Sequence, residues 1–381
     1  MQKIYADNSS TSFPKAPGVS DAIKDFLDNV GCNINRGGYE ASYNTALEIL
    51  ETRKLLCEMF NFNAPRNVVF TPGITYSINM ILQGFLKEGD HAITTSMEHN
   101  AVMRPLHELT KRGITYSQAQ CAEDGTLDPQ AITRLINKNT KAVIMTHASN
   151  VCGTILPIRE IYEICASRGI KLIVDTAQTA GDIEIDMTYA DAITFTAHKG
   201  LLATQGLGGL LTKNDLQINP IITGGTGSKS HEITQPDFMP DKLEPGTMNI
   251  PAIIGLKKSL EFIKSTGTSA IHEKKMFLIN LFFQLISEIP EAIIIGRKDL
   301  QNRTAVVSLN FTTIDNAQVS AALADDYGIM TRCGLHCAPT AHKTLKTYPH
   351  GTVRFSFGYF NTPDEIKYIA DSIKKIIKGA N

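Results

Sequence analysis

The sequence contains no apolar run of the roughly 20 residues that a helix needs to cross a bilayer. Its first residues, MQKIYADNSSTSFPK, also lack the apolar core of a secretory signal. The 37 basic and 38 acidic side chains leave a net charge of −1, so no excess of positive charge is available to attract nucleic acid or an anionic membrane. We therefore expect a cytoplasmic protein that binds neither nucleic acids nor membranes.

Cysteine is too sparse for a secreted disulfide scaffold. Seven cysteines are scattered over 381 residues, and an odd number without close spacing argues against a framework of disulfides. Hydrophobic residues make up 43% and charged residues 20% of the chain, which is ordinary for a globular protein with a sizeable core. The length is compatible with one large α/β domain and a smaller partner.

Short apolar runs alternate with segments of helical periodicity between residues 45 and 260. Runs such as KAVIMT and KLIVD are bounded by turn residues and are typical of buried parallel strands. This alternation predicts a mostly parallel sheet with helices on both faces. We expect strands at 67–71, 91–95, 141–146, 171–175 and 192–195, and helices at 47–60, 74–86 and 157–168.

The pattern changes near residue 251. A long helical stretch comes first, and strand-like runs, a turn-rich segment at 331–349, a last strand and a last helix follow it. This order predicts a smaller α+β domain packed on the large one. We place the large domain at residues 15–255, and the small domain at residues 1–14 together with 256–381.

Ligands of open α/β sheets bind beyond the carboxyl ends of the strands. Asp175 ends one predicted strand, and Lys199 follows the next. A lysine in such a crevice can form a Schiff base with pyridoxal phosphate (PLP), and a carboxylate can keep the ring nitrogen of that cofactor protonated. Gln178 could donate to the ring hydroxyl. Taken alone, the same Asp and Lys could equally form a structural ion pair.

A phosphate site is predicted where a strand turns into a helix. The segment Thr71-Pro72-Gly73-Ile74-Thr75 offers free N–H groups at a helix start and a hydroxyl, a combination that favours an anion. Thr196 and His198 lie beside Lys199 in the sequence and could add phosphate contacts.

Ten short motifs are spread over nearly the whole chain. They are ADNSST (6–11), NRGG (35–38), FTPGITYSIN (70–79), MEHN (97–100), SNVCGTILPI (149–158), VDTAQTAG (174–181), AHKG (197–200), EPGTMN (244–249), RCGLHCAP (332–339) and VRFSFGYFNT (353–362). In this order the chain resembles the cysteine desulfurases and selenocysteine lyases, which are class V aminotransferases among the fold-type I PLP enzymes. The resemblance implies PLP as cofactor and the fold of that group, a mostly parallel sheet of seven strands with a smaller α+β domain.

The resemblance implies a role for each cofactor residue. Lys199 matches the lysine of the Schiff base, Asp175 the partner of the pyridinium nitrogen and Gln178 the partner of the ring oxygen. His99 matches a histidine that stacks on the ring and relays protons. The phosphate site is expected to comprise Gly73, Ile74, Thr75, Thr196 and His198, together with Thr247 of a second subunit, which implies a homodimer.

The resemblance also implies the substrate and the reaction. Asn35, Asn150, Arg332 and Arg354 are expected to hold the amino-acid substrate, and a guanidinium suits its carboxylate because it can bind both oxygens. Cys337 lies in a segment whose Gly and Pro indicate a loop. Its thiolate is expected to attack the sulfur of L-cysteine. L-alanine then leaves, and a persulfide remains on Cys337 for an acceptor protein.

Several alternatives stay open at this point. A selenocysteine lyase, a cysteine or cystine C–S lyase, an aminotransferase and a PLP-binding protein without turnover would share the fold and the cofactor. Cys333, His336, Cys337 and His342 offer four zinc ligands, although Cys-x2-His-Cys-x4-His is not a usual zinc spacing, and we expect no metal. Cys333 and Leu335 depart from the family pattern, and Cys333 could resolve the persulfide or form a disulfide with Cys337.

Overall fold

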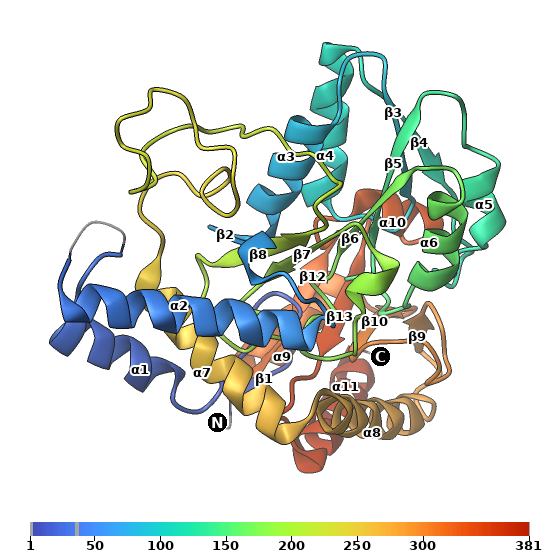
Figure 1. Ribbon diagram of the computed structural model, residues 1–381. Helices are drawn as coiled ribbons and strands as arrows, with labels where there is room; N and C mark the ends of the chain where they lie inside the picture. The colour runs from blue at the N-terminus through green and yellow to red at the C-terminus, as the bar shows by residue number, and fades with distance from the viewer. Residues whose placement is uncertain (1–2, 35–37, 381) are drawn as a thin grey trace.

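The computed structural model describes residues 3–34 and 38–380, and a seven-stranded sheet lies at the centre of this part of the chain (Figure 1). The strand order is β2-β8-β7-β6-β5-β3-β4, and only β8 runs antiparallel to its neighbours. The prediction of a mostly parallel sheet is therefore confirmed. The strands are β2 (Val68–Thr71), β3 (His91–Thr95), β4 (Thr115–Ala119), β5 (Thr140–Thr146), β6 (Lys171–Asp175), β7 (Ala192–Thr196) and β8 (Gly208–Thr212).

Helices cover both faces of the central sheet because successive side chains of a strand point to opposite sides. Along β5, Val143 and Met145 belong to one core, whereas Ala142 and Ile144 belong to another. α3 and α4 pack on the second face, and the other helices of this part on the first. These helices are α1 (Val19–Asp25), α2 (Glu40–Met59), α3 (Ile74–Phe85), α4 (Asn100–Leu109), α5 (Pro129–Thr133), α6 (Ile158–Ala166) and α7 (Ile250–Thr266).

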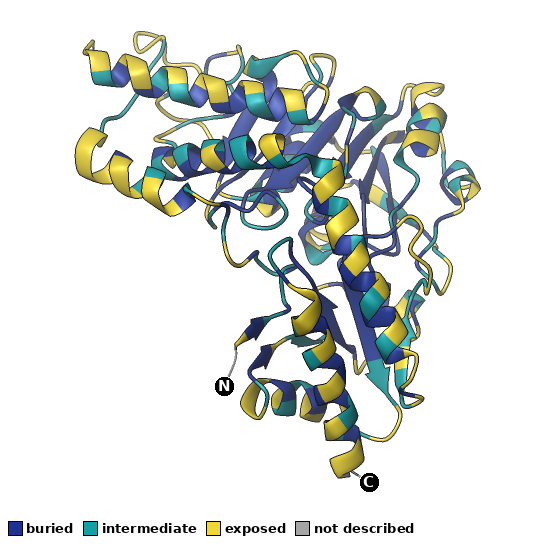
Figure 2. Ribbon diagram, turned by 90° about the horizontal axis from the view of Figure 1, so that it is seen from below, coloured by how far each residue is buried: buried dark blue, intermediate teal, exposed yellow. Residues whose placement is uncertain are grey.

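A second sheet with its own core lies at the end of the molecule that carries both termini (Figure 2). Its antiparallel strands have the order β12-β13-β10-β9, and the N-terminal strand β1 pairs nearby with β11. Helices α8, α9 and α11 supply apolar side chains to this core. The elements are β1 (Ile4–Tyr5), α8 (Thr268–Ile286), β9 (Ala292–Ile295), β10 (Val306–Phe311), α9 (Asn316–Asp325), β11 (Ile329–Met330), β12 (Arg332–Gly334), α10 (Pro339–Thr344), β13 (Thr352–Ser356) and α11 (Pro363–Ala380).

The expected boundary between residues 255 and 256 falls within α7. Buried side chains on both sides of that point, such as Ile253 and Ile263, pack into the same core as α2. Ile4 and Ala6, by contrast, belong to the core of the second sheet. The division into 15–255 and 1–14 with 256–381 stays a prediction. Among the described helices, none is long and apolar enough to span a membrane.

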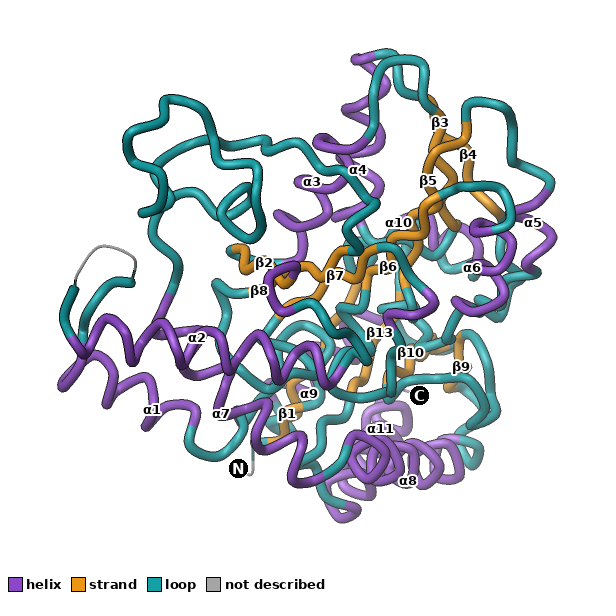
Figure 3. The backbone as a smooth tube through the Cα atoms, viewed as in Figure 1, coloured by secondary structure: helices purple, strands orange, loops and turns teal. Residues whose placement is uncertain are grey.

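A long loop, residues 213–249, joins β8 to α7 (Figure 3). Its returning segment is fixed by Glu244, whose carboxylate pairs with Arg53 of α2 at 2.7 Å and accepts a hydrogen bond from the N–H of Phe70 at 2.6 Å. The exposed fractions of the Arg53 and Glu244 side chains are only 7% and 5%. This buried ion pair therefore ties the segment that carries Thr247 to α2 and to the β2 edge of the sheet.

We expect Glu244→Ala to lower the free energy of unfolding by about 3–5 kcal/mol, because it leaves a buried guanidinium without its partner. Lys264→Ala serves as the matched control, since Lys264 pairs with Glu58 at the surface at 2.7 Å and exposed pairs contribute about 1 kcal/mol or less. Denaturant unfolding followed by circular dichroism measures both losses. Equal losses in the two variants would contradict a dominant role for the buried pair.

Candidate active site

The expected cofactor residues meet at one edge of the central sheet. Asp175 is the last residue of β6, Thr196 is the last residue of β7, and Gly73 directly precedes α3. Because β2, β6 and β7 run in the same direction, their carboxyl ends lie at the same edge. Lys199 is within electrostatic reach of both Asp175 and His99. The structure thus brings together residues that are far apart in the sequence.

Lys199 is half-buried at the centre of this group. Burial is the main cause that lowers the pKa of its amino group to about 8, and the positive charges of Arg354 and Arg332 act in the same direction. The carboxylates of Asp175 and Asp7 oppose this shift only in part. About a tenth of such amines are neutral at pH 7, and the neutral amine is the form that attacks a carbonyl carbon.

Asp175 is buried at the end of β6, with an exposed fraction of 3%. Its Oδ1 accepts a hydrogen bond from the N–H of Ala177 at 2.8 Å. Burial raises the pKa of Asp175, whereas the Ala177 hydrogen bond and Lys199 lower it. A buried carboxylate with a single backbone donor favours a cationic partner, and the protonated ring nitrogen of PLP is such a partner.

His99 is the N-cap residue of α4. Its Nδ1 accepts a hydrogen bond from the N–H of Ala101 at 3.0 Å, so the neutral ring carries its proton on Nε2. Burial lowers the pKa of His99 to about 4, and Lys199 and Arg332 contribute to the same shift. The imidazole is therefore neutral at physiological pH. In this form it can stack on an aromatic ring and donate a proton from Nε2.

Several polar groups at the phosphate end have no partner of their own. Among the described residues, no side chain caps the N-terminus of α3, and the buried Nδ1 of His198 has no hydrogen-bond partner. Burial, followed by the charges of Lys199 and Lys15, lowers the pKa of His198 to about 4. Unpaired helix N–H groups and a neutral imidazole are suitable donors for a phosphate. The residues present therefore fit the phosphate of PLP.

The remaining expected cofactor residues have different surroundings. Thr75 is exposed on the first turn of α3, while Ile74 and Thr196 are buried. Thr247 is exposed on the segment that Glu244 fixes, and its expected role concerns a second subunit. Asn35, an expected substrate residue, lies outside the described residues.

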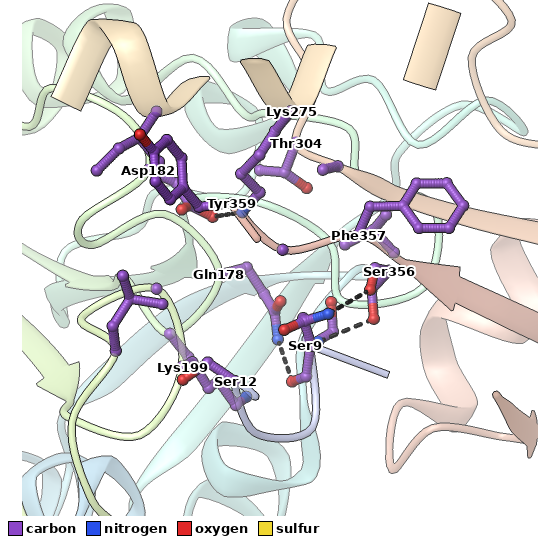
Figure 4. Close-up of a pocket in the computed structure, with 18 residues that line it drawn as sticks. Ser9, Ser12, Gln178, Asp182, Lys199, Lys275, Thr304, Ser356, Phe357 and Tyr359 are labelled. Carbon is purple, nitrogen blue, oxygen red and sulfur yellow. Dashed lines mark hydrogen bonds and ion pairs between the residues drawn. The ribbon is translucent and has the colours of Figure 1, made fainter. Parts of the chain in front are cut away.

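A polar cavity of about 30 Å³ lies beside Lys199, between the two sheets (Figure 4). Gln178 lines it and donates from Nε2 to the carbonyl of Ser9 at 3.3 Å. Asp182 and Lys275 of α8 form a buried ion pair in its wall. The N-terminal segment and α8 therefore close the site on the side of Lys199 and Gln178.

Two arginines of the second sheet enter the site side by side. Arg332 of β12 and Arg354 of β13 are cross-strand neighbours. Arg354 is 1% exposed and donates to the carbonyl of Asn150 at 3.0 Å and to the carboxylate of Asp7 at 2.7 Å. Its buried Nε has no partner among the described residues. Two guanidiniums beside one carboxylate leave a positive site that suits the carboxylate of an amino acid.

Asp7 and Ser10 are site residues that the sequence motifs did not predict. Asp7 pairs with Arg354, and the hydroxyl of Ser10 accepts hydrogen bonds from Arg354 at 2.8 Å and from Arg332 at 3.2 Å. Both belong to the motif ADNSST, so a signal was present. Only the fold reveals that this motif meets strands more than 300 residues away, as the pairing of Ser10 with Arg332 demonstrates.

Glu98 is a second residue without an assigned role, although it directly precedes His99. It is fully buried and accepts hydrogen bonds from the hydroxyl of Thr95 at 2.6 Å and from the N–H of Thr146 at 3.0 Å. Burial raises the pKa of Glu98 to about 8, and the nearby Asp175 adds to this shift against the two hydrogen bonds. Glu98 thereby fixes the loop that presents His99 to the end of β5.

Cys337 is exposed on a strained loop. His336 and Cys337 have φ angles of 49° and 57°, a conformation that costs a non-glycine residue about 1–3 kcal/mol. Two hydrogen bonds hold the loop in this state: the carbonyl of His336 accepts from Nδ2 of Asn150, and the carbonyl of Cys337 accepts from the N–H of Asn100, both at 2.8 Å. The second bond places Cys337 next to His99, and both residues line one cleft.

Arg332 lies close to the thiol of Cys337. Its Nη2 is 3.3 Å from the sulfur and donates a hydrogen bond to it. Cys333, in contrast, packs against the core of the second sheet near Asp315, where burial raises the pKa of its thiol. Successive side chains of β12 point to opposite faces, so Cys333 faces away from Arg332. The structure gives no support to a disulfide between Cys333 and Cys337.

The four side chains of the zinc alternative do not converge on one point. His336 bonds to the hydroxyl of Thr352 at 2.9 Å, and His342 bonds to the hydroxyl of Thr347 at 2.7 Å. The two rings pack on each other with centroids 5.3 Å apart. Within residues 3–34 and 38–380, no group of three or more His, Cys, Asp or Glu side chains could hold a metal ion. The two histidines instead support the loop of Cys337.

The chain is similar to known proteins over nearly its whole length. The chain matches the family described as "Aminotransferase class-V" over residues 4–369. The "Probable cysteine desulfurase" of Methanothermobacter thermautotrophicus is 30% identical over 98% of this chain and 94% of its own. The "Probable cysteine desulfurase" of Pyrococcus abyssi is 29% identical over 100% of this chain and 95% of its own.

Solved structures give the same result. The apo cysteine desulfurase of Thermococcus onnurineus has a TM-score of 0.91 at 29% identity, covering 99% of this chain and 95% of its own. The cysteine desulfurase of Escherichia coli, at 24% identity and a TM-score of 0.88, shares the fold. The expected fold, an α/β domain with a seven-stranded sheet and an α+β part, is confirmed. Because the match extends over nearly its whole length, the chain belongs to the class-V aminotransferase family.

Proposed function

We propose that this protein is a PLP-dependent cysteine desulfurase that converts L-cysteine to L-alanine and holds the released sulfur as a persulfide on Cys337. The observation that carries the proposal is the exposed thiol of Cys337, which lies beside Arg332 at 3.3 Å and lines a cleft together with His99. The names of the similar proteins support the choice of substrate.

The cofactor would be held by residues that meet at the carboxyl edge of the central sheet. Lys199 would bind it covalently, Asp175 would pair with its ring nitrogen, and the N-terminus of α3 with His198 would bind its phosphate. When bound, PLP supplies a sink for the electron pair that remains after Cα loses its proton. Arg354 and Arg332 would orient the substrate by its carboxylate.

The residues of the chain then divide the proton and sulfur transfers. Lys199, with a pKa near 8, is suited to take the proton of Cα. The thiolate of Cys337 attacks the sulfur of the substrate, and the carbon–sulfur bond breaks with its electrons left on carbon. Cβ takes up the one proton that the thiol of Cys337 gave up, and Cα regains the proton held by Lys199. Alanine then leaves, and the sulfur with its hydrogen stays on Cys337. Neutral His99, with its proton on Nε2, is suited to relay protons in the site.

We expect Cys337→Ala to lower alanine formation from cysteine by about 10²-fold or more, because the attacking thiol is removed. The yellow colour of the bound cofactor should remain. Cys333→Ala is the matched control, since Cys333 faces α9 and should leave the rate unchanged. Amino-acid analysis of alanine measures both.

The same variant separates the rival activities. With selenocysteine as substrate, alanine formation by Cys337→Ala is expected to persist if selenium leaves without thiol attack. Undiminished turnover of cysteine by Cys337→Ala would exclude the persulfide step and favour a C–S lyase. Accumulation of pyridoxamine phosphate in the wild type would favour an aminotransferase, and a coloured protein without any alanine would favour a binding protein.

We expect the apoprotein to bind PLP faster as the pH rises from 6 towards 9, with a midpoint near 8. Only the neutral amine of Lys199 attacks the aldehyde, and burial lowers its pKa to about 8, so the reactive fraction rises in this window. Absorbance recorded after mixing measures the rate. Lys199→Arg, which keeps the charge, should give no coloured adduct. A midpoint near that of an ordinary lysine, about 10.4, would be inconsistent with this electrostatic role.

We also infer that the protein is a homodimer. On α2, Tyr43 and Leu47 are exposed by 62% and 57%, and their spacing of four puts them on one helix face. Exposed apolar patches of this kind are typical of interfaces. Thr247, on the neighbouring fixed segment, is then available to reach the phosphate of the second copy.

Sedimentation of the wild type is expected to give twice the chain mass of 41.7 kDa. The double variant Tyr43→Glu, Leu47→Glu should shift the equilibrium towards monomers, because it buries charge in the interface. Thr247→Ala should keep the dimer but bind PLP more weakly. A wild type that sediments as a monomer with fully bound PLP would refute the shared site.

A further inference from the structure

A cleft runs from the reacting thiol along α3 and α4. We call the end with Cys337 and His99 its inner end, and the end with Lys111 and Arg112 of the short helix η3 (Thr110–Arg112) its outer end. Helix α4 forms one wall, and Asn79 of α3 contributes to the other. Whatever receives sulfur from Cys337 can therefore approach along this cleft.

The cleft carries an excess of positive charge. Arg104, Lys111 and Arg112 line it, with Glu108 as its one carboxylate. Lys111 pairs with Glu108 at 2.8 Å, whereas no acidic side chain of the described residues pairs with Arg104 or Arg112. All three cations are exposed. The charges of Arg104 and Arg112 are therefore not neutralised by a carboxylate of the described residues, and their field extends over roughly 8 Å at physiological ionic strength.

The dimensions suit one extended segment of polypeptide. From His99 to Arg112 the chain is almost entirely helical, and at about 1.5 Å per residue this stretch is roughly 20 Å long. An extended peptide covers that distance with about six residues. The polar amides of Asn79 and Gln83 of α3 line the opposite wall and can pair with the backbone of such a segment.

We propose that this cleft docks an acidic, cysteine-bearing segment of a sulfur-acceptor protein. The inference rests on the proposed function, because it needs the persulfide on Cys337. Carboxylates of the segment pair with Arg104 and Arg112, and its thiol reaches the inner end of the cleft. A nucleic acid or a lipid headgroup would match the charge but lacks the thiol that must receive the sulfur.

The transfer step balances without an external oxidant or reductant. The thiolate of the acceptor attacks the outer sulfur of the persulfide, and the bond between the two sulfur atoms breaks. The outer sulfur moves with its hydrogen to the acceptor. Cys337 leaves as a thiolate, a charge that Arg332 at 3.3 Å stabilises.

The test uses three blocked hexapeptides, each with one central cysteine among glutamates, serines or lysines. The PLP-loaded protein is first treated with cysteine to form the persulfide and freed of excess substrate. Each peptide is then added, and mass spectrometry follows its persulfide over time. We expect the glutamate peptide to accept sulfur about 10-fold faster than the lysine peptide at low salt. This ratio should fall towards one as salt rises.

The decisive variant is Lys111→Glu, Arg112→Glu, which reverses the charge at the outer end of the cleft. We expect it to favour the lysine peptide over the glutamate peptide. The two peptide thiols differ in intrinsic reactivity. This difference cancels when the ratio of the two peptide rates is compared between the wild type and the variant. Arg66→Glu is the control, because Arg66 is exposed in the helix η2 (Pro65–Asn67) and does not line the cleft; its ratio should equal that of the wild type.

Alanine formation with dithiothreitol as the acceptor separates the two proposals. Its absence in the wild type would refute the desulfurase function itself. If alanine formation is normal but the peptide ratio is the same in the wild type and the charge-reversed protein, docking in this cleft is refuted. Docking is also refuted if a second copy of the chain fills the cleft. Arg112→Gln is a milder change that should lower the ratio of the glutamate-peptide rate to the lysine-peptide rate in part. It replaces the double variant in the test if that variant does not fold.

Discussion

The chemistry of the site depends on the partial burial of Lys199 beside two guanidiniums. Burial and the charges of Arg332 and Arg354 lower the pKa of Lys199 to about 8, and the same causes keep His99 neutral. Neutral bases can take protons, and the remaining positive charge attracts the carboxylate of an amino acid. The negative charge of Asp175 partly offsets the positive charge of Lys199, and that of Asp7 partly offsets the charge of Arg354. Each carboxylate thus has a nearby cation that reduces the free-energy cost of its burial.

This balance requires segments from the whole chain to meet in one place. The parallel strands bring Asp175, Thr196 and the start of α3 to a common edge, while the second sheet supplies the arginines. The N-terminal segment lies between them: Asp7 binds Arg354, and the carbonyl of Ser9 accepts from Gln178. The site is therefore assembled at the junction of the two sheets. A shift of one sheet against the other would change the distance between the lysine and the arginines, and with it the charge balance.

The sequence predicted the parts whose signal is local. The strands predicted at 91–95 and 171–175 agree with β3 and β6, because short apolar runs between turn residues usually form buried strands in an α/β protein. β8 escaped prediction because Gly208 and Gly209 indicate a turn by propensity, yet a Cβ on Gly208 would lie 2.8 Å from Cα of Gly73. Glycine is needed at 208 because the backbone of Gly73 packs closely against it in the folded protein, and the local sequence does not reveal this contact. The family motifs likewise identified Lys199 and Arg354 but not the nearby Asp7, because contacts between distant segments are not visible in the sequence. The spacing of Cys333 and Cys337 also did not reveal that the two thiols face different ways.

The position of Cys337 suits the two reactions that the proposed function assigns to one thiol. It would have to reach sulfur that is bound among Lys199 and the arginines, and it would then have to present that sulfur to an acceptor. A residue deep in the site could do only the first, and one on an open surface only the second. The loop resolves this conflict by holding Cys337 with a positive φ at the point where the site and the cleft along α4 meet. Its strain of about 1–3 kcal/mol per residue is similar in size to the contribution of the hydrogen bonds from Asn150 and Asn100. The hydrogen bonds therefore offset much of the strain and hold Cys337 beside His99.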